Sequence, residues 1–355
     1  MREFQAEVPQ AELDELQRRL ESARWPDQLP DVEWSYGLER GRLKQLAEYW
    51  RTSYDWRRFE KRLNAHPQYV TEIDGQRVHF IHTKSKGTPL LLLHGWPGAA
   101  SDFLELIEPL TESGFNLVIP TMPGFGFSGP TTATGWGVER IAKAWATLME
   151  QLGYEQYGVH GYDWGARIGP ALARHAPKKV IGLHLDGFLA FPTGDEELTD
   201  AERQRLSGLE RWNSERSGYA QIQATRPQTL AYALIDSPVG QLAWNLEWYD
   251  DYGHRVGVIG NDQILDSVTL TWLTGTAGSQ ARIYREAQSS WTTLTTRCDV
   301  PTGLAVFPSD STVRRLAERE LNVVHYTEFD RGGHFAALEV PELVIEDLQA
   351  FFRNL

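Results

Sequence analysis

The stretch Gly161-Tyr162-Asp163-Trp164-Gly165 decides the expected fold of this chain of 355 residues. It directly follows the apolar run Tyr157–Val159 and directly precedes a helix-like run from Ala166. A sharp turn from a strand into a helix crowds the residues two positions to either side of its tip, so these must be small. The two glycines meet that demand, and the pattern predicts a nucleophile elbow with Asp163 at its tip.

Short apolar runs, which alternate with helical patterns, surround the elbow in the sequence. The predicted strands are Tyr69–Ile73, Val78–His82, Pro89–Leu93, Asn116–Pro120, Tyr157–Gly161, Val180–Leu185, Thr302–Phe307 and Asn322–Phe329. Asp74-Gly75 joins the first two in a predicted hairpin. Apolar residues from Val138 to Leu152 share one helical face between two later strands. The alternation predicts an α/β chain with a mostly parallel, doubly wound sheet.

The chain divides into four predicted regions. Residues 1–68 are polar and helical, with helices expected at Ala11–Leu20 and Gly41–Arg51, and form an arm that packs on the core. The tryptophans that suggest this packing are Trp25, Trp34, Trp50 and Trp56. Residues 69–189 and 291–355 form the two parts of the core, and the second ends in a helix from Pro341 to Phe352. Residues 190–290 lack the alternation, so we expect an inserted helical lid there.

The composition disfavours several classes of partner. The net charge of −13 opposes the phosphate backbone of nucleic acid and offers no basic stretch for anionic lipid. The opening MREFQAEVPQ has no long apolar core, and the run Leu90–Leu93 is far shorter than the roughly 20 residues that span a bilayer. Cys298, the only cysteine, can form no intrachain disulfide and is expected to be a packed thiol. We therefore predict a cytoplasmic protein with a neutral small-molecule partner; a homodimer is left open.

A second motif, His94-Gly95-Trp96-Pro97-Gly98, follows the predicted strand Pro89–Leu93. In a fold with a nucleophile elbow, the amide after this strand joins the amide that follows the nucleophile to form an oxyanion hole. The backbone amides of Trp96 and Trp164 are therefore the expected donors. Taken alone, the motif could be only a packed corner.

A base and an acid are expected in loops that follow the last strands. His334, in Arg331-Gly332-Gly333-His334-Phe335, is the candidate base because the flexible glycines let its ring reach the elbow. Asp310 is the candidate acid, which gives the chain order nucleophile, acid, histidine. Asp186, after an earlier strand, is the rival acid, and Asp310 could instead cap a helix that begins near Thr312.

Five other histidines indicate packing rather than a metal site. His79 and His82 lie three apart in a predicted strand and so point to opposite faces, which argues against a metal pair. His94, His160 and His184 are expected to be structural. No metal and no organic cofactor is predicted.

An aspartate at the tip of the elbow changes the expected chemistry. The chain contains no G-x-S-x-G, so serine esterase or lipase chemistry lacks its central residue. A carboxylate that attacks an sp³ carbon forms an alkyl ester, whose carbonyl water can then attack. Epoxides and alkyl halides are the candidate substrates. Alternatively, Asp163 only caps the helix that follows.

With these motifs together, the sequence resembles the epoxide hydrolases, and within them the microsomal-type branch. The resemblance runs through nearly the whole chain and includes Trp25-Pro26, Trp34–Gly37, His94–Gly98, Pro123–Ser128, the elbow and Gly332–Phe335. It implies the α/β-hydrolase fold and the conversion of an epoxide and water to a vicinal diol through an ester on Asp163. It also implies two lid tyrosines that act as acids on the epoxide oxygen, and the matching contexts are those of Tyr219 and Tyr284. Without the resemblance, either tyrosine would be interpreted as lid packing.

Two other functions stay in competition. A haloalkane dehalogenase also uses an aspartate elbow and a histidine base, but it needs N–H donors for halide instead of a lid acid. A non-catalytic binding protein of the same fold would be expected to lose part of the triad. The membrane-bound relatives carry an N-terminal anchor that has no counterpart in this sequence. Trp244, Trp248 and Tyr249 hint at a large or aromatic epoxide, and both detoxification and secondary-metabolite biosynthesis are open.

Overall fold

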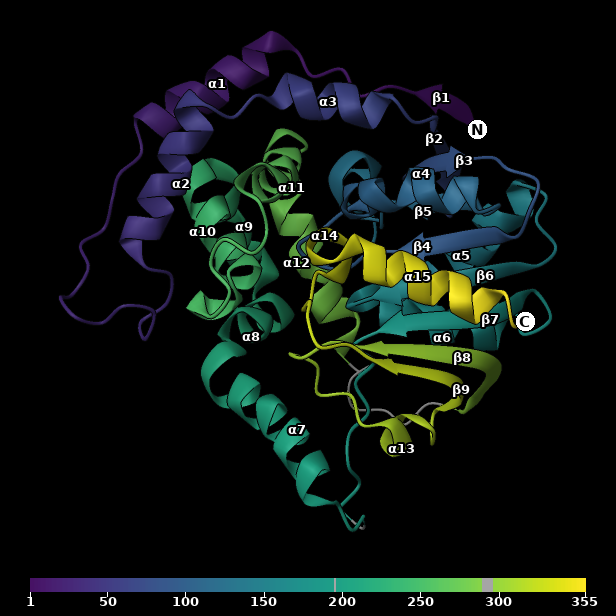
Figure 1. The fold of residues 1–355 in the computed structure, drawn as a ribbon. Helices are drawn as coiled ribbons and strands as arrows, with labels where there is room; N and C mark the ends of the chain where they lie inside the picture. Colours follow the sequence, from purple (N-terminus) through teal and green to yellow (C-terminus); the bar gives the residue numbers. More distant parts are fainter. Residues whose placement is uncertain (195, 289–295) are drawn as a thin grey trace.

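The computed structural model describes residues 1–194, 196–288 and 296–355. Within these residues, nine strands form one sheet in the order β1-β2-β3-β5-β4-β6-β7-β8-β9 (Figure 1). The strands are β1 Arg2–Phe4, β2 Gln68–Ile73, β3 Gln76–Thr83, β4 Pro89–Leu93, β5 Asn116–Pro120, β6 Tyr157–Tyr162, β7 Val180–Asp186, β8 Cys298–Val306 and β9 Leu321–Glu328. All eight predicted strands are confirmed, to within a few residues at their ends.

The pairing of the strands confirms a mostly parallel, doubly wound sheet. Strands β5, β4, β6, β7, β8 and β9 are parallel to one another, whereas β1, β2 and β3 add an antiparallel edge that pairs with β5. The predicted hairpin of β2 and β3 turns at Asp74 and Gly75, whose φ angles are 53° and 71°. Positive φ at both central residues gives the turn the twist that a two-residue hairpin needs.

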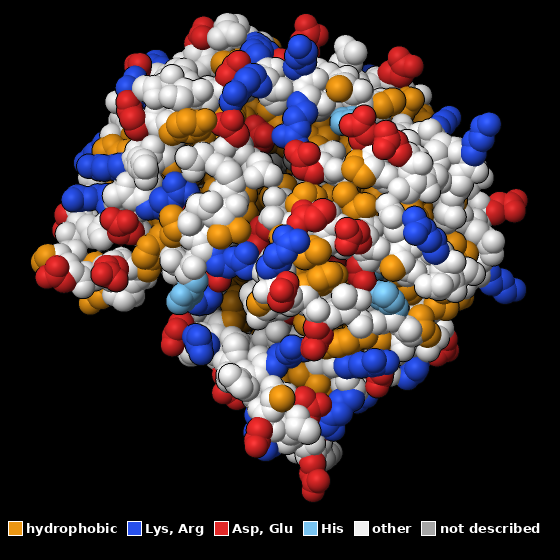
Figure 2. All heavy atoms as spheres, in the orientation of Figure 1, with side chains coloured by type: hydrophobic (Ala, Val, Ile, Leu, Met, Phe, Trp, Pro, Cys, Tyr) orange, Lys and Arg blue, Asp and Glu red, His pale blue; other side chains and the backbone are white. Residues whose placement is uncertain are grey.

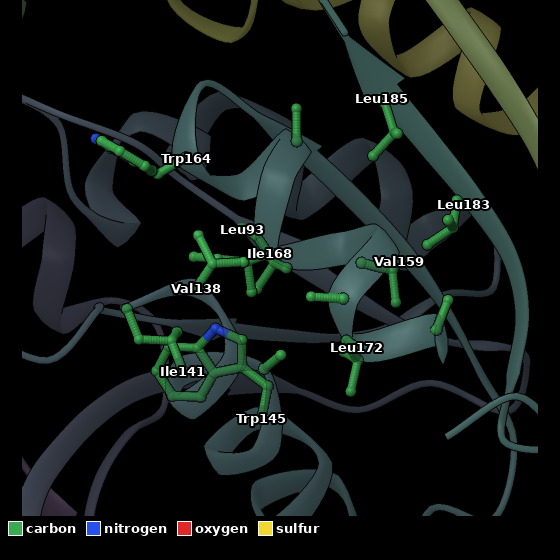
Figure 3. Close-up of a cluster of buried hydrophobic side chains, with 14 of the residues drawn as sticks. Leu93, Val138, Ile141, Trp145, Val159, Trp164, Ile168, Leu172, Leu183 and Leu185 are labelled. Atoms are coloured by element: carbon green, nitrogen blue, oxygen red, sulfur yellow. The ribbon is translucent and has the colours of Figure 1, made fainter. Parts of the chain in front are cut away.

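Helices cover both faces of the sheet, because side chains on successive strand residues point to opposite sides. Leu91 and Leu93 of β4 belong to the cluster under α5 (Val138–Gln151) and α6 (Trp164–His175). Figure 3 shows Val138, Ile141 and Trp145 of α5 against the side chains of α6 and β6. The predicted helical face from Val138 onward is therefore buried.

The opposite face of the sheet packs against a second group of helices. Leu90 and Leu92 belong to the cluster that includes residues of α4 (Leu104–Glu112) and α15 (Pro341–Phe352). In Figure 1, α15 crosses in front of the strands. Burial on both faces explains why β4 is apolar along its whole length.

A helical insertion, residues 200–286, lies between β7 and β8 and beyond the carboxyl ends of the parallel strands (Figure 1). Its helices are α7 Asp200–Arg211, α8 Gly218–Thr225, α9 Pro227–Asp236, α10 Pro238–Tyr249, α11 Asn261–Leu273 and α12 Ala277–Glu286, with short turns at η3 Trp212–Arg216 and η4 Asp251–Gly253. The predicted boundary between residues 290 and 291 lies outside the described residues.

The N-terminal arm contacts the insertion as well as the core. Its helices are α1 Gln10–Glu21, α2 Arg40–Thr52 and α3 Trp56–Asn64, and β1 extends the sheet. Arg42 of α2 forms a buried, bidentate ion pair with Asp250, with Nε–Oδ2 and Nη2–Oδ1 distances of 2.8 and 3.2 Å. The hydroxyl of Tyr54 donates to Asp266 of α11 at 2.8 Å. The arm therefore anchors one side of the insertion, a contact that the sequence did not predict.

The charge distribution on the surface and the burial of the single cysteine agree with what the sequence predicted. On the face in Figure 2, acidic and basic side chains are interspersed rather than gathered by sign. Cys298 is buried at the start of β8. Of the helices in the described parts of the chain, none combines the length and the apolar character that crossing a bilayer requires. The cytoplasmic location stays a prediction.

Candidate active site

The turn between β6 and α6 has the geometry that the glycine spacing predicts. Asp163 lies between them at φ 51° and ψ −121°, a backbone conformation that residues other than glycine rarely adopt. A Cβ on Gly161 would lie 2.6 Å from the carbonyl of Gly165, and one on Gly165 would lie 2.1 Å from the carbonyl oxygen of Leu93. Asp163 makes no capping hydrogen bond to α6, so capping does not explain the aspartate.

The carboxylate of Asp163 has two different partners. Its Oδ1 accepts a hydrogen bond of 2.8 Å from the backbone amide of Trp96. Its Oδ2 lies 3.5 Å from Nε2 of His334. A Cβ on Gly95 would come within 2.1 Å of Oδ1, so glycine there allows the close approach of the two loops. The motif at residues 94–98 thus adjoins the elbow.

His334 lies in the loop between β9 and the short helix α14 (Ala336–Glu339). Its ring packs against the indole of Trp248, with centroids 4.8 Å apart. Burial disfavours the charged ring, but the carboxylates of Asp163 and Asp310 outweigh that effect and raise the pKa of His334. The two carboxylates therefore favour the charged form of the ring as long as Asp163 is not esterified.

Asp310 follows β8 and lines the same cavity as His334. Its Oδ2 accepts a hydrogen bond of 2.8 Å from the amide of Phe307, so the side chain folds back on its own loop and caps no helix. Removal from water raises the pKa of Asp310 to about 6, although the Phe307 amide and the charge of His334 oppose the shift. Gly187, at φ 64°, makes room for Asp310: a Cβ there would lie 2.9 Å from its Oδ1.

Asp186, the rival acid, lies at the end of β7 and is 6% exposed. Burial, followed by the charges of Asp310 and Asp347, raises its pKa well above the ordinary range. Its Oδ1 has no hydrogen-bond partner. The two candidate acids therefore have different histidine neighbours. The charge of His334 acts on Asp310, whereas Asp186 faces the buried rings of His160 and His184.

The two tyrosines proposed from the resemblance meet in front of the elbow. Tyr219 opens α8 and Tyr284 belongs to α12, and their ring centroids are 5.7 Å apart. Tyr219 stacks on Trp96 at 5.1 Å, and Tyr284 packs edge-on against Trp164 at 5.0 Å. Burial, with a further contribution from the charge of Asp163, raises the pKa of both phenols well above 10. Both therefore remain protonated donors at neutral pH.

A π-helical turn, η3, leads directly into α8 and thus positions Tyr219. Such turns are rare and are frequent at functional sites. Trp212, Asn213 and Arg216 of this turn line the cavity. No pattern in the sequence indicated the π-helical turn.

One cavity, of about 900 Å³, is lined by the proposed nucleophile, base, acid and phenols and by the rival acid, but not by Trp96. These lining residues are Asp163, Trp164, Asp186, Tyr219, Tyr284, Asp310 and His334. Its remaining walls include the aromatic side chains of Phe191, Trp212, Trp248, Tyr252 and Phe307, together with aliphatic, polar and charged residues such as Leu209, Arg216 and Arg255. The volume lies near the upper end of the range for small-molecule sites.

Two residues that the sequence analysis missed hold the histidine loop in place. Glu339 accepts a hydrogen bond of 3.1 Å from the amide of Phe335 and forms an ion pair with Arg255 of the insertion. Arg255 also donates to the carbonyl oxygen of Gly332. A carboxylate four residues after Phe335 was a local signal that could have been read. Arg255 has no such signal, because its partners lie about 80 residues away.

Among the described residues, the group with metal-ligand chemistry is His160, His184 and Asp186.

His94, which was also expected to be structural, accepts a hydrogen bond of 2.9 Å from the amide of Met122 at Nε2. Its Nδ1 lies 2.9 Å from the carbonyl oxygen of Gly95. Both nitrogens of His94 therefore have protein partners.

Two family models match the first 226 residues of the chain, and relatives match nearly its whole length. Residues 1–103 match the family model described as epoxide hydrolase N terminus, and residues 88–226 match that of the alpha/beta hydrolase fold. A putative epoxide hydrolase of Stigmatella aurantiaca is 43% identical over 374 residues, which cover 99% of this chain and 84% of that protein. Juvenile hormone epoxide hydrolase 2 of Ctenocephalides felis is 32% identical, over 98% of this chain and 84% of its own length.

Two solved structures are similar over 99% of this chain. The epoxide hydrolase of Aspergillus niger is 29% identical, with a TM-score of 0.88 and 96% of that chain covered. The juvenile hormone epoxide hydrolase of Bombyx mori is 28% identical, with a TM-score of 0.91 and 94% of that chain covered. The fold is therefore the α/β-hydrolase fold, as predicted.

Proposed function

The chain belongs to the epoxide hydrolases, in their microsomal-type branch, and we propose that it forms a vicinal diol through a covalent ester on Asp163. The observation that carries this proposal is the position of the Asp163 carboxylate at the tip of the elbow. One oxygen accepts from the Trp96 amide, and the other faces His334. A carboxylate so placed is free to attack a carbon in the cavity.

In the first step, Oδ2 of Asp163 attacks one epoxide carbon, and the bond from that carbon to the ring oxygen breaks. Tyr219 and Tyr284 donate hydrogen bonds to the ring oxygen, and one of them transfers its proton to the developing alkoxide. Their raised pKa values support this role, because both phenols carry their protons at neutral pH. Tyr219 comes from α8 and Tyr284 from α12, and their ring centroids are 5.7 Å apart.

In the second step, His334 takes a proton from water, and the resulting hydroxide attacks the ester carbonyl of Asp163. The amides of Trp96 and Trp164 stabilise the oxyanion, and Asp310 stabilises the charged ring of His334. Collapse of the tetrahedral intermediate breaks the bond from the carbonyl carbon to the alkyl oxygen. The departing alkoxide takes the proton of the hydroxyl that water added to Asp163, which releases the diol and restores the carboxylate. The proton on His334 restores the tyrosine that gave up its own.

Ester formation itself increases the fraction of His334 that is neutral and able to accept a proton. In the free enzyme, the charge of Asp163 contributes to the raised pKa of His334. Esterification removes that charge, so the pKa of His334 falls and the neutral ring becomes available. The base is thus released when the ester needs hydrolysis.

We further propose a bulky and largely apolar epoxide as substrate, with the insertion as its lid. The cavity of about 900 Å³ and the aromatic side chains in its walls support this size and character. The phenols of Tyr219 and Tyr284 favour an epoxide over an alkyl halide, because a leaving alkoxide needs a proton and a leaving halide does not.

The path of oxygen tests the ester route. With enzyme in excess and a single turnover in ¹⁸O-water, the first diol should carry mainly unlabelled oxygen, because its new hydroxyl comes from the Asp163 carboxylate. The label should appear in the peptide that contains Asp163. Immediate full labelling of the diol, with no label at Asp163, would falsify covalent catalysis.

A further inference from the structure

One buried hydrogen bond joins the elbow to the segment that carries the Trp96 amide. The hydroxyl of Tyr162, the residue before Asp163, donates to Oδ2 of Asp102. Asp102 belongs to the short helix η1 (Ala100–Phe103), which follows the motif at residues 94–98. Tyr162 and Asp102 are only 4% and 3% exposed. The two segments that meet at the Asp163 carboxylate are therefore joined a second time, through side chains that the reaction itself does not use.

Gly98 leaves the space in which this hydrogen bond forms. A Cβ on Gly98 would lie 1.8 Å from Oδ2 of Asp102 and 2.7 Å from the hydroxyl oxygen of Tyr162. Both partners of the bond therefore lie against the backbone of the loop that holds the Trp96 amide. This contact gives a reason for the last glycine of the motif at residues 94–98, to which the sequence analysis gave no role.

The protonation states of the two groups agree with the direction of the bond. Burial, followed by the charge of Asp102, raises the pKa of Tyr162 well above 10, so its phenol keeps its proton. Burial raises the pKa of Asp102 to about 6, although the hydrogen bond from Tyr162 opposes the shift. At pH 8 the phenol therefore donates to a carboxylate. Hydrogen bonds to a charged acceptor are stronger than those between neutral groups.

We propose that Asp102 and Tyr162 are positioning residues that hold the Trp96 amide in place for the hydrolysis of the Asp163 ester. This inference rests on the ester route proposed above. Oδ1 of Asp163, which accepts from Trp96, becomes the carbonyl oxygen of the ester and takes up negative charge when water attacks. During alkylation the carboxylate instead loses charge, so the same donor gives no advantage to that transition state. Accurate placement of the amide therefore matters most in the second step.

The hydroxyl of Tyr162 can be removed without its ring. The ring packs edge-on against Phe103 and His334, with centroids 5.8 and 6.0 Å away, and Tyr162→Phe retains these contacts. Ser267 of the insertion donates to the carbonyl oxygen of Pro97 at 3.3 Å, so the loop with the Trp96 amide keeps another anchor. We therefore expect the variant to fold and to hold this loop less firmly.

Single-turnover kinetics at pH 8 separates the two steps. In Tyr162→Phe, alkylation of Asp163 should keep the wild-type rate, whereas ester hydrolysis should slow about 10-fold, less than the roughly 10²–10³-fold lost with a whole donor. Intact mass spectrometry should then detect more ester than in the wild type. Hydrolysis at the wild-type rate, or equal slowing of both steps, would overturn the proposal.

Tyr154→Phe is the matched control for the loss of a tyrosine hydroxyl. The hydroxyl of Tyr154 lies 2.8 Å from Nε2 of His82, and Tyr154 precedes the amino end of β6, whereas the elbow follows the carboxyl end. Hydrolysis in this variant should keep the wild-type rate. Slowing equal to that of Tyr162→Phe would overturn the proposal, because the effect would then not depend on the contact with Asp102.

Substitutions of Asp102 test the other partner. Asp102→Asn retains an acceptor for the phenol and should keep most of the hydrolysis rate, whereas Asp102→Ala should slow hydrolysis as Tyr162→Phe does. The double variant Tyr162→Phe with Asp102→Ala should be no slower than either single variant, because both act through one hydrogen bond. Additive slowing, or equal rates in Asp102→Asn and Asp102→Ala, would contradict this coupling.

Hydrogen exchange of the Trp96 amide provides a test without turnover. In the free enzyme, this amide should exchange with deuterium faster in Tyr162→Phe than in the wild type or in Tyr154→Phe. Unchanged exchange would overturn the proposal. The outcomes also separate this inference from the ester route: a lack of ester in every variant and in the wild type contradicts the route, whereas an ester that Tyr162→Phe hydrolyses at the wild-type rate contradicts the inference alone.

Discussion

Nε2 of His334 lies 3.5 Å from Oδ2 of Asp163, so the proposed base is also the ion-pair partner of the proposed nucleophile. This relationship couples the two steps of the reaction. While Asp163 is a carboxylate, it favours the charged form of His334. Once Asp163 is an ester, Asp310 and Glu339 remain as the negative neighbours of the ring. The two steps therefore differ in their pH dependence.

The first prediction concerns that difference. An NMR titration of His334 in the free enzyme should give a pKa above the ordinary value for histidine, because Asp163 is charged. The acidic limb of ester hydrolysis, measured on preformed ester, should lie at lower pH than this titration. The sign follows because a lost negative neighbour lowers the pKa of a cation. Coincidence of the two midpoints would contradict the proposed release of His334.

A trapped ester is the second prediction. His334→Gln should be alkylated by an epoxide but should hydrolyse slowly, because the variant lacks the base. Intact mass spectrometry should then detect an adduct, and peptide mapping should place it at Asp163. Asp163→Ala is the matched control and should show neither adduct nor turnover. Rapid full turnover by His334→Gln would mean that another group acts as base.

The local part of the site could be predicted from the sequence, because its constraints act over a few residues. The glycines at 161 and 165 must be small for the turn to form, and the structure has backbone atoms within 2.6 Å of each missing Cβ. The positions of the eight predicted strands and the helical face from Val138 likewise follow from short-range periodicity. Such patterns depend only on residues that are close together in the sequence.

The choice between Asp310 and Asp186 could not be made that way. Both follow a predicted strand, and the sequence gives no distance from either to His334. The structure gives them different neighbours on other elements: His334 acts on Asp310, and His160 of β6 faces Asp186. The ion pair of Arg255 with Glu339 and the pairing of β1 with β2 are also contacts between residues far apart in the sequence. Periodicity carries no information about them.

The third prediction tests the two phenols. Tyr219→Phe and Tyr284→Phe should each slow alkylation, and the double change should nearly stop it. The loss of one donor to developing negative charge costs about 2.7–4 kcal/mol in comparable sites. Single-turnover kinetics measures the step. Tyr232→Phe, at a tyrosine of the insertion that is 71% exposed, is the matched control and should leave the rate unchanged. Alkylation at the wild-type rate in the double variant would mean that the acid lies elsewhere.

The last prediction concerns the contact between the arm and the insertion. The ion pair of Arg42 and Asp250 is buried, with side chains 9% and 1% exposed. Removal of one partner leaves the other charge buried and unpaired, which costs about 3–5 kcal/mol. Arg42→Ala should therefore lower the free energy of unfolding by that amount in denaturant titration. Arg18→Ala is the matched control, because Arg18 pairs with Glu15 at an exposed site, where an ion pair contributes little, and its loss should leave the free energy of unfolding nearly unchanged. The double change Arg42→Met with Asp250→Leu should recover part of the loss, since no unpaired charge remains. Equal destabilisation by Arg42→Ala and Arg18→Ala would show that the buried pair does not anchor the insertion.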